Sequence, residues 1–155
     1  MCIYQMLEIS KGLLTPIIAV IATYIAWQQW KVNKQKLKLE LYDRRLAIYE
    51  EVMKILSIIL RDADASFDDL LKYRTSVSEA DFLFEKEIPF YIDEIYQRGI
   101  KLHKLNKQCN ESKEKNTDGF KDAEIMEKVG KELEWLTKQF DPAKEKFKQY
   151  LEISK

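Results

Sequence analysis

The sequence predicts an all-α protein, with a single N-terminal transmembrane helix followed by a cytosolic bundle of four to five helices. Three observations lead to this fold class. Only 4 Gly and 3 Pro occur in 155 residues, so helix breakers are scarce. An uncharged stretch lies near the N-terminus, between Lys11 and Lys31. From residue 41 onward, apolar residues recur every three or four positions, which is the period of an α-helix.

The uncharged stretch, Gly12 to Trp30, has the length of a membrane span. Its 19 residues would form a helix of roughly 28 Å, close to the thickness of a hydrocarbon core. Trp27 and Trp30 lie at one end, where amphipathic rings favour the lipid–water boundary. A signal peptide would carry its positive charge before the apolar stretch, and a buried core helix this apolar would need a larger protein around it. We therefore expect a transmembrane helix at 12–30.

Flanking charges predict the orientation of this helix. Residues 31–45 contain six basic and two acidic side chains, whereas the preceding segment offers only Glu8 and Lys11. By the positive-inside rule, residues 1–11 form a short extracytoplasmic tail and residues 31–155 form the cytosolic bundle. Membrane lipid is then an expected partner.

Within the span, small residues form a stripe at spacings of four, three and four. Such stripes let transmembrane helices approach closely, so the stripe predicts self-association into a homo-oligomer, although alanine is also simply common in membrane helices. The stripe consists of Thr15, Ala19, Ala22 and Ala26. If the helices surround a lumen, the mildly polar candidates to face it are Thr15, Thr23 and Gln28.

The helical pattern continues past the membrane over residues 41–60. Two neighbouring apolar stripes make a face broader than a two-stranded seam, which is typical of the first helix of a bundle and also offers an oligomer interface. The first stripe is Tyr42, Leu46, Tyr49, Met53, Leu56 and Leu60, and the second is Leu41, Ile48, Val52, Ile55 and Ile59. The polar region Asp62–Asp64 is expected to end this helix.

Capping residues predict the elements that follow. Ser66 is expected to cap a short helix that ends near Thr75, and Ser78 to cap a further short turn. Pro89 suits the first position of the next helix. That helix keeps a heptad rhythm through Ile88, Ile92, Ile95, Gly99 and Leu102.

The C-terminal third is expected to contain a loop and two helices. Residues 106–119 are polar and predict a loop. The apolar pattern from Phe120 to Phe140 predicts a helix whose inward side chains are Val129, Leu133, Leu136 and Phe140. Asp141-Pro142 then starts the last helix, which uses Phe147, Tyr150 and Leu151.

Composition excludes several kinds of chemistry. The chain has one His (His103) and two Cys (Cys2 and Cys109), too few for a conventional zinc site, and no disulfide framework is implied. Its four glycines are isolated, so no phosphate-binding glycine loop exists. With 26 basic and 26 acidic residues, the chain shows no sign of DNA binding. We expect no cofactor and no metal.

One motif carries candidate catalytic chemistry, namely Arg98 followed after four residues by His103. An arginine can hold a phosphate through two hydrogen bonds, and a histidine can transfer a proton near neutral pH. On one continuous helix, however, these positions are about 140° apart and share no face. The alternative is structural, with Arg98 forming an (i, i+4) ion pair with Glu94.

Arg98 and His103, together with the single span and the helical cytosolic domain, make the chain resemble the small membrane-anchored HEPN-like accessory proteins of type VI-B RNA-guided CRISPR systems. The match departs from the HEPN pattern at Gly99, where a polar residue is usual. The resemblance implies an oligomeric effector in the bacterial inner membrane that acts in antiphage defence. It also implies that an RNA-guided nuclease or its RNA products act as partners.

Two other functions remain open on the sequence. The first is a membrane-anchored HEPN ribonuclease that uses Arg98 and His103. The second is a membrane-tethered scaffold that docks a cytosolic partner through its acidic stretch, since residues 62–94 hold ten acidic and three basic side chains.

Overall fold

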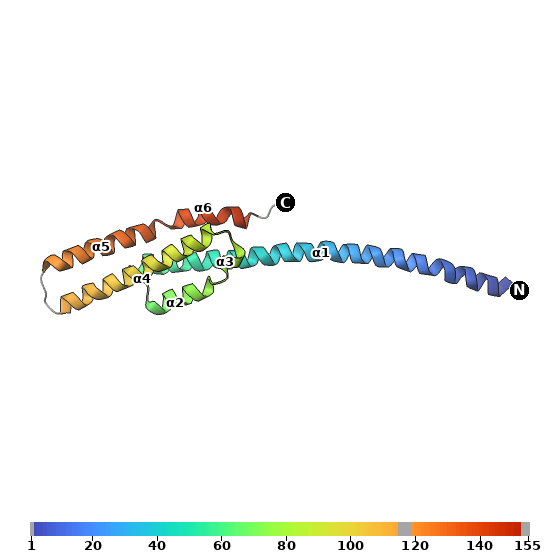
Figure 1. Ribbon diagram of the computed structural model, residues 1–155, viewed down its shortest axis with the longest axis horizontal. Coiled ribbons are helices and arrows are strands. Elements are labelled where there is room, and N and C mark those ends of the chain that lie inside the picture. Colours follow the sequence, from blue (N-terminus) through green and yellow to red (C-terminus); the bar gives the residue numbers. More distant parts are fainter. Residues whose placement is uncertain (1, 115–118, 153–155) are drawn as a thin grey trace. The chain divides into compact units, whose positions relative to one another are not determined.

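A computed structural model of the chain describes the backbone of residues 2–114 and 119–152 and the side chains of residues 16–111 and 123–152. All regular structure in these ranges is helical, and they contain no strand (Figure 1). The predicted all-α class is therefore confirmed. In chain order the helices are α1 (Cys2–Asp62), α2 (Phe67–Ser76), α3 (Ala80–Leu83), α4 (Glu87–Glu114), α5 (Gly119–Thr137) and α6 (Phe140–Leu151).

The chain divides into two compact units, Met1–Glu40 and Leu41–Lys155. The first unit is the N-terminal part of α1, and every side chain from residue 16 to residue 40 is exposed. Among the residues whose side chains are described, no helix has the length and hydropathy of a membrane span. The first four residues of the predicted span, 12–15, lie outside that set.

The core of the second unit begins on α1. Of the two predicted stripes, the second supplies more of the core, because Ile48, Val52, Ile55 and Ile59 are all at most 3% exposed. From the first stripe, only Leu56 is fully buried, and Leu60 is 58% exposed. Tyr42, Leu46, Tyr49 and Met53 are half-buried. The broad apolar face predicted over 41–60 is therefore present, and Leu60 at its end lies at the surface.

The turn after α1 follows the sequence signals closely. The helix ends at Asp62, and Ala63 adopts a left-handed backbone with φ of 53°. Ser66 then caps α2, because its hydroxyl accepts a hydrogen bond from the backbone N–H of Asp69 at 3.1 Å. Both predictions for this turn are confirmed.

Two predicted helix starts are wrong in detail. The N-cap position of the short helix α3 is Glu79 rather than the predicted Ser78, and the Glu79 side chain makes no capping hydrogen bond. α4 begins at Glu87, which places Pro89 inside its first turn rather than at its first position. Proline fits there because N–H groups of the first turn have no partner within the helix.

The predicted loop at 106–119 is wrong over 106–114, because α4 continues to Glu114. Residues 115–118 lie outside the described residues. The segment is polar, but its lysine, glutamate and glutamine residues are good helix formers. It also has an inner side, since Cys109 is buried and the Asn106 side chain donates a hydrogen bond to the Ala63 carbonyl at 3.1 Å.

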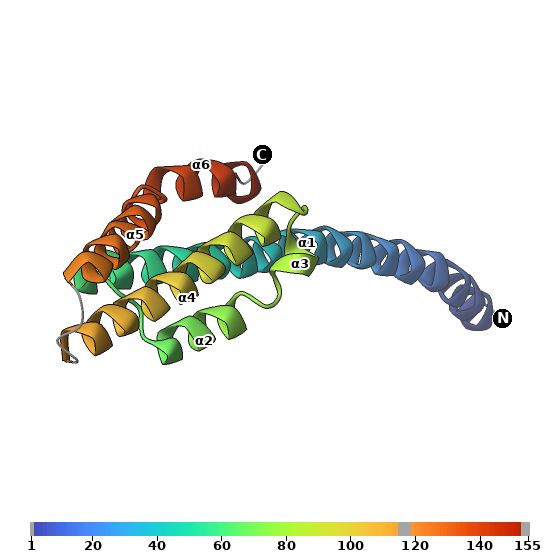
Figure 2. The ribbon, with the colours of Figure 1, turned by 60° about the vertical axis from the view of Figure 1, so that its left-hand side comes forward.

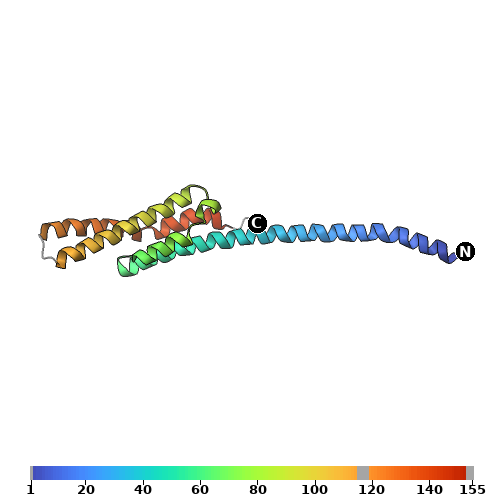
Figure 3. The same ribbon diagram turned by 60° about the horizontal axis from the view of Figure 1, so that its bottom comes forward.

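The last two helices divide earlier than predicted. α5 ends at Thr137, so Phe140 begins α6 instead of closing α5. Leu136, Ala143 and Phe147 are fully buried and bring both helices into the core. Within the second unit, α4 lies alongside α5 and also packs against α2 (Figures 2 and 3).

The predicted heptad of α4 is confirmed. Ile88, Ile92, Ile95 and Leu102 are at most 2% exposed. Gly99 completes this row for a steric reason: a Cβ at this position would lie 2.7 Å from Leu70 Cδ2 on α2. The glycine therefore allows the close approach of α2 and α4, and α4 passes through it without a break.

Candidate functional site

The apolar part of the first unit is the most unusual surface of the protein. Its large apolar side chains are 48–69% exposed, and they are Ile17, Ile18, Val20, Ile21, Tyr24, Ile25, Trp27 and Trp30. By helical geometry they cover about two thirds of the circumference and alanines occupy the rest, so no charged face is available to water. A helix that is apolar all round requires a covering of lipid or protein.

The residues predicted to pack spans together lie on this exposed helix. Ala19, Ala22 and Ala26 are all exposed, whereas the side chain of Thr15 lies outside the described residues. The two other candidates for a lumen are hydrogen-bonded within the helix. Thr23 Oγ1 donates to the Ala19 carbonyl at 2.8 Å, and Gln28 Nε2 donates to the Tyr24 hydroxyl at 3.0 Å.

The basic residues that follow the apolar stretch divide into two groups. Arg45 is built into the second unit: it donates to the carbonyls of Leu83 and Tyr150 at 3.0 and 3.4 Å, and its guanidinium lies over the rings of Phe84 and Tyr150. Arg44 lies 3.6 Å from Glu79. The other group consists of exposed lysines at positions 31, 34, 36 and 38.

Two of these lysines stack on the tryptophans at the end of the apolar stretch. The Lys31 ammonium lies 5.9 Å from the Trp27 ring centroid, and the Lys34 ammonium lies 5.2 Å from that of Trp30. Both distances fall within the range of a cation–π interaction. The sequence predicted the boundary position of these rings but not their pairing with lysine.

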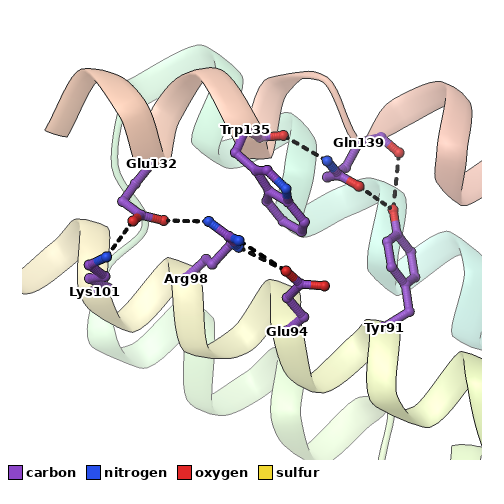
Figure 4. A network of polar contacts seen from close by, with 7 residues as sticks. All are labelled: Tyr91, Glu94, Arg98, Lys101, Glu132, Trp135 and Gln139. Carbon is purple, nitrogen blue, oxygen red and sulfur yellow. Dashed lines mark hydrogen bonds and ion pairs between the residues drawn. The ribbon is translucent and has the colours of Figure 1, made fainter. Parts of the chain in front are cut away.

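Arg98 lies in a polar network between α4 and α5 (Figure 4). Its Nε and Nη2 donate to Glu94 at 3.1 and 3.0 Å, and its Nη1 donates to Glu132 at 3.1 Å. The guanidinium also stacks 4.0 Å from the centroid of Trp135. The predicted ion pair with Glu94 is therefore confirmed, and both edges and one face of the guanidinium are occupied.

Glu132 is the residue of this network that sequence reasoning missed. It is only 6% exposed, and its second oxygen accepts a hydrogen bond from Lys101 at 2.6 Å. Burial raises the pKa of the Glu132 carboxyl, but the hydrogen bonds from Lys101 and Arg98 outweigh this effect and hold the pKa below its ordinary value. A signal was available, because Glu132 falls in the inward row of α5 with Val129 and Leu136.

A second set of hydrogen bonds extends the network to the junction of α5 and α6 (Figure 4). The Tyr91 hydroxyl donates to the Gln139 carbonyl at 3.2 Å and also lies 3.3 Å from Gln139 Oε1. Gln139 Nε2 donates to the Trp135 carbonyl at 2.9 Å. Burial raises the pKa of Tyr91 well above its ordinary value, so the hydroxyl stays protonated as a donor. These contacts fix the bend between the two helices.

His103 points to a different part of the molecule. Its Nδ1 lies 3.2 Å from Asp64 Oδ2, in the turn between α1 and α2. The other oxygen of Asp64 is buried and has no hydrogen-bond partner among the described residues. Arg98 faces α5 and His103 faces this turn, so the structure does not bring the two motif residues together within one chain.

The acidic stretch 62–94 contributes an exposed surface with a hollow of about 370 Å³. Phe84 and Phe90 line it, together with Asp81, Asp93 and Arg74. Phe90 is 72% exposed and Phe82, on the neighbouring α3, is 89% exposed. Arg74 pairs with Asp93 at 2.8 Å across α2 and α4.

Comparisons of the chain with protein-family models, with curated proteins and with solved structures give no match.

Proposed function

We propose that this protein is a single-pass membrane protein that self-associates through its apolar helix and perturbs or permeabilises the membrane. The observation that carries the proposal is segment 16–30 of α1, whose side chains are all exposed and uncharged. Together with Gly12–Thr15 it makes up the uncharged 19-residue stretch. Immersion in lipid covers such a helix without any other partner.

Self-association is supported by the exposed alanine stripe. Small side chains allow two helix backbones to approach closely, and lipid offers no better contact to the same face. In this proposal several copies pack their spans side by side. The setting in antiphage defence of a bacterial inner membrane is supported by the resemblance of Arg98, His103 and the domain order to type VI-B accessory proteins.

Membrane potential in expressing cells tests this function. We expect expression of the wild-type chain to depolarise the inner membrane, as read with a potential-sensitive dye. Ala22→Leu, which adds bulk to the alanine stripe, should abolish depolarisation at equal membrane abundance. Val20→Leu, on another face of the helix, is the matched control and should depolarise like the wild type. Equal activity of both variants would contradict packing through the stripe.

The scaffold function is the second candidate, and it is favoured by the hollow that exposed Phe90 lines and by the exposed Phe82 on the neighbouring α3. Exposed aromatic rings beside a hollow are typical of protein interaction sites. Under this alternative, Phe82→Ser with Phe90→Ser would abolish the protein's activity in cells without changing the mass of the membrane-extracted complex. Loss of activity through Ala22→Leu alone would favour the effector instead.

A ribonuclease has less support from the geometry. Arg98 is held by two carboxylates and His103 lies at a separate turn, so a composite site would require Arg98 to leave Glu132. We expect His103→Gln to leave cellular RNA integrity and depolarisation unchanged. RNA cleavage by the wild type that His103→Gln removes, at unchanged protein abundance, would establish the enzyme.

A further inference from the structure

The lysines and tryptophans at the end of the apolar helix form one continuous face. At about 100° per residue, Trp27, Trp30, Lys31, Lys34 and Lys38 fall within a sector of about 100°. Cation–π contacts place two of the ammonium groups directly beside the rings. The contacts of Lys31 and Lys34 in the described part of the chain are those with the tryptophan rings.

Negative charge is kept away from this face. Glu40, the acidic residue that follows these lysines in the first unit, lies about 120° around the helix from Lys34. Lys36 lies on the far side as well, about 160° from Lys34. The face therefore combines two rings suited to the lipid–water boundary with three cations directed to the same side of the helix.

We propose that this face binds the headgroup phosphate of anionic phospholipids. This inference rests on the proposed membrane insertion and adds the class of lipid. The rings lie at the depth of the headgroups, and the ammonium groups stacked on them meet the phosphate layer. A zwitterionic lipid also carries a phosphate, but its own ammonium group compensates that charge, so the lysines discriminate in favour of a net negative headgroup.

The lysines of the lipid-binding face and the alanine stripe occupy different sides of the helix, whereas Trp30 follows Ala26 by one turn and continues the line of the stripe. The stripe of Ala19, Ala22 and Ala26 is centred roughly 90° around the helix from Lys34. The lysines can therefore contact lipid while the stripe faces a neighbouring span. Bound anionic lipid would then surround the assembled spans.

Tryptophan quenching by brominated lipids tests this inference on the full chain reconstituted in bilayers. Dibrominated phosphatidylglycerol and dibrominated phosphatidylcholine are compared as quenchers of Trp27 and Trp30, with Trp135 as a constant background. We expect phosphatidylglycerol to bind on the order of a hundredfold more tightly than phosphatidylcholine, since three lysines contribute about fivefold each. Lys34→Gln should lower this ratio by about fivefold, the effect of one basic residue near the surface. Lys36→Gln removes the same charge from the opposite face and should leave the ratio within twofold of wild type.

The possible outcomes separate the inference from the proposed function. Equal quenching by the two lipids in the wild type would overturn the lipid preference and leave membrane insertion standing. No quenching by either lipid would contradict insertion itself. If Lys34→Gln and Lys36→Gln lowered the binding ratio equally, the lipid preference would come from the overall positive charge and the single binding face would be contradicted. Added inorganic phosphate at constant ionic strength should not change the ratio. If it competed with phosphatidylglycerol, the site would instead be one for free phosphate.

Discussion

At the scale of single residues, the ion network around Glu132 shows how a buried charge is accommodated in this bundle. Removing a carboxylate from water is costly, and the cost is offset only if its oxygens are hydrogen-bonded by cations. Lys101 and Arg98 each bind one oxygen of Glu132, and Glu94 and Trp135 hold Arg98 in place. The motif arginine thus joins α4 to α5.

The first residue-level prediction concerns Glu132→Gln. The glutamine amide keeps one acceptor oxygen but presents an NH2 group to the second cation, so the loss of charge and of one hydrogen bond should lower the free energy of unfolding by about 2 kcal/mol at pH 7. Because the folded pKa of Glu132 is depressed, its contribution is complete above the unfolded value of about 4.3 and disappears as the pH falls through the folded value. The difference between wild type and variant should therefore shrink in acid. Urea unfolding of the full chain in mild detergent, followed by circular dichroism, measures it.

Glu134→Gln provides the matched control for this prediction. Glu134 also lies on α5 and pairs with a lysine, Lys138, but its side chain is 65% exposed. Its replacement should leave the free energy of unfolding close to that of the wild type, because the ion pair is exposed to solvent. A loss through Glu134→Gln as large as that through Glu132→Gln would contradict the importance of burial.

The second residue-level prediction compares two helical glycines. At Gly99 an added methyl group would collide with the buried Leu70, so Gly99→Ala should destabilise the protein by about 1 kcal/mol despite better helix propensity. At Gly130 the added methyl would meet nothing within 4 Å, so Gly130→Ala should stabilise it by up to about 1 kcal/mol. Thermal unfolding should give melting temperatures that shift in opposite directions. Stabilisation by both substitutions would contradict the close packing of α2 on α4.

At the scale of elements, local signals were sufficient where one residue's chemistry decides the outcome. The helix cap at Ser66, the end of α1 at Asp62 and the heptad of α4 are determined by residues that are close to one another in the sequence. The position at which α4 ends is determined by contacts with residues that are distant in the sequence. The polar stretch 106–114 stays helical because Cys109 packs inward and Asn106 bonds Ala63, more than forty positions away in the chain. Sequence reasoning had no access to those contacts.

A proline tests the extension of α4 beyond residue 106. Asn110 lies inside the helix, so Asn110→Pro should remove a backbone hydrogen bond, crowd the carbonyl of Asn106 and cost about 3 kcal/mol. Asn110→Ala, the control, should be neutral or slightly stabilising because alanine favours helix. If Asn110→Pro were as stable as Asn110→Ala in urea unfolding, this stretch would be a loop.

At the scale of the whole molecule, the features of the first unit can be read directly from the sequence, and its insertion in a membrane stays a prediction. The uncharged stretch, the terminal tryptophans and the lysines are contiguous in the chain, so no tertiary contact was needed to recognise them. The Glu132 network, by contrast, depends on how α4 and α5 are aligned along each other. The polar residues between these helices did not indicate that alignment. The sequence therefore offered both a catalytic and a structural role for Arg98, and it predicted the ion pair with Glu94 but not the contacts with Glu132 and Trp135.

The mass of the complex extracted from membranes into nanodiscs tests the central claim most directly. Native mass spectrometry of the full chain should give a single closed oligomer of several 18.5 kDa subunits. Ala22→Leu should shift that complex toward the monomer, whereas Val20→Leu should not. A chain that remains in the soluble fraction, or a wild-type monomer in the nanodisc, would contradict the account.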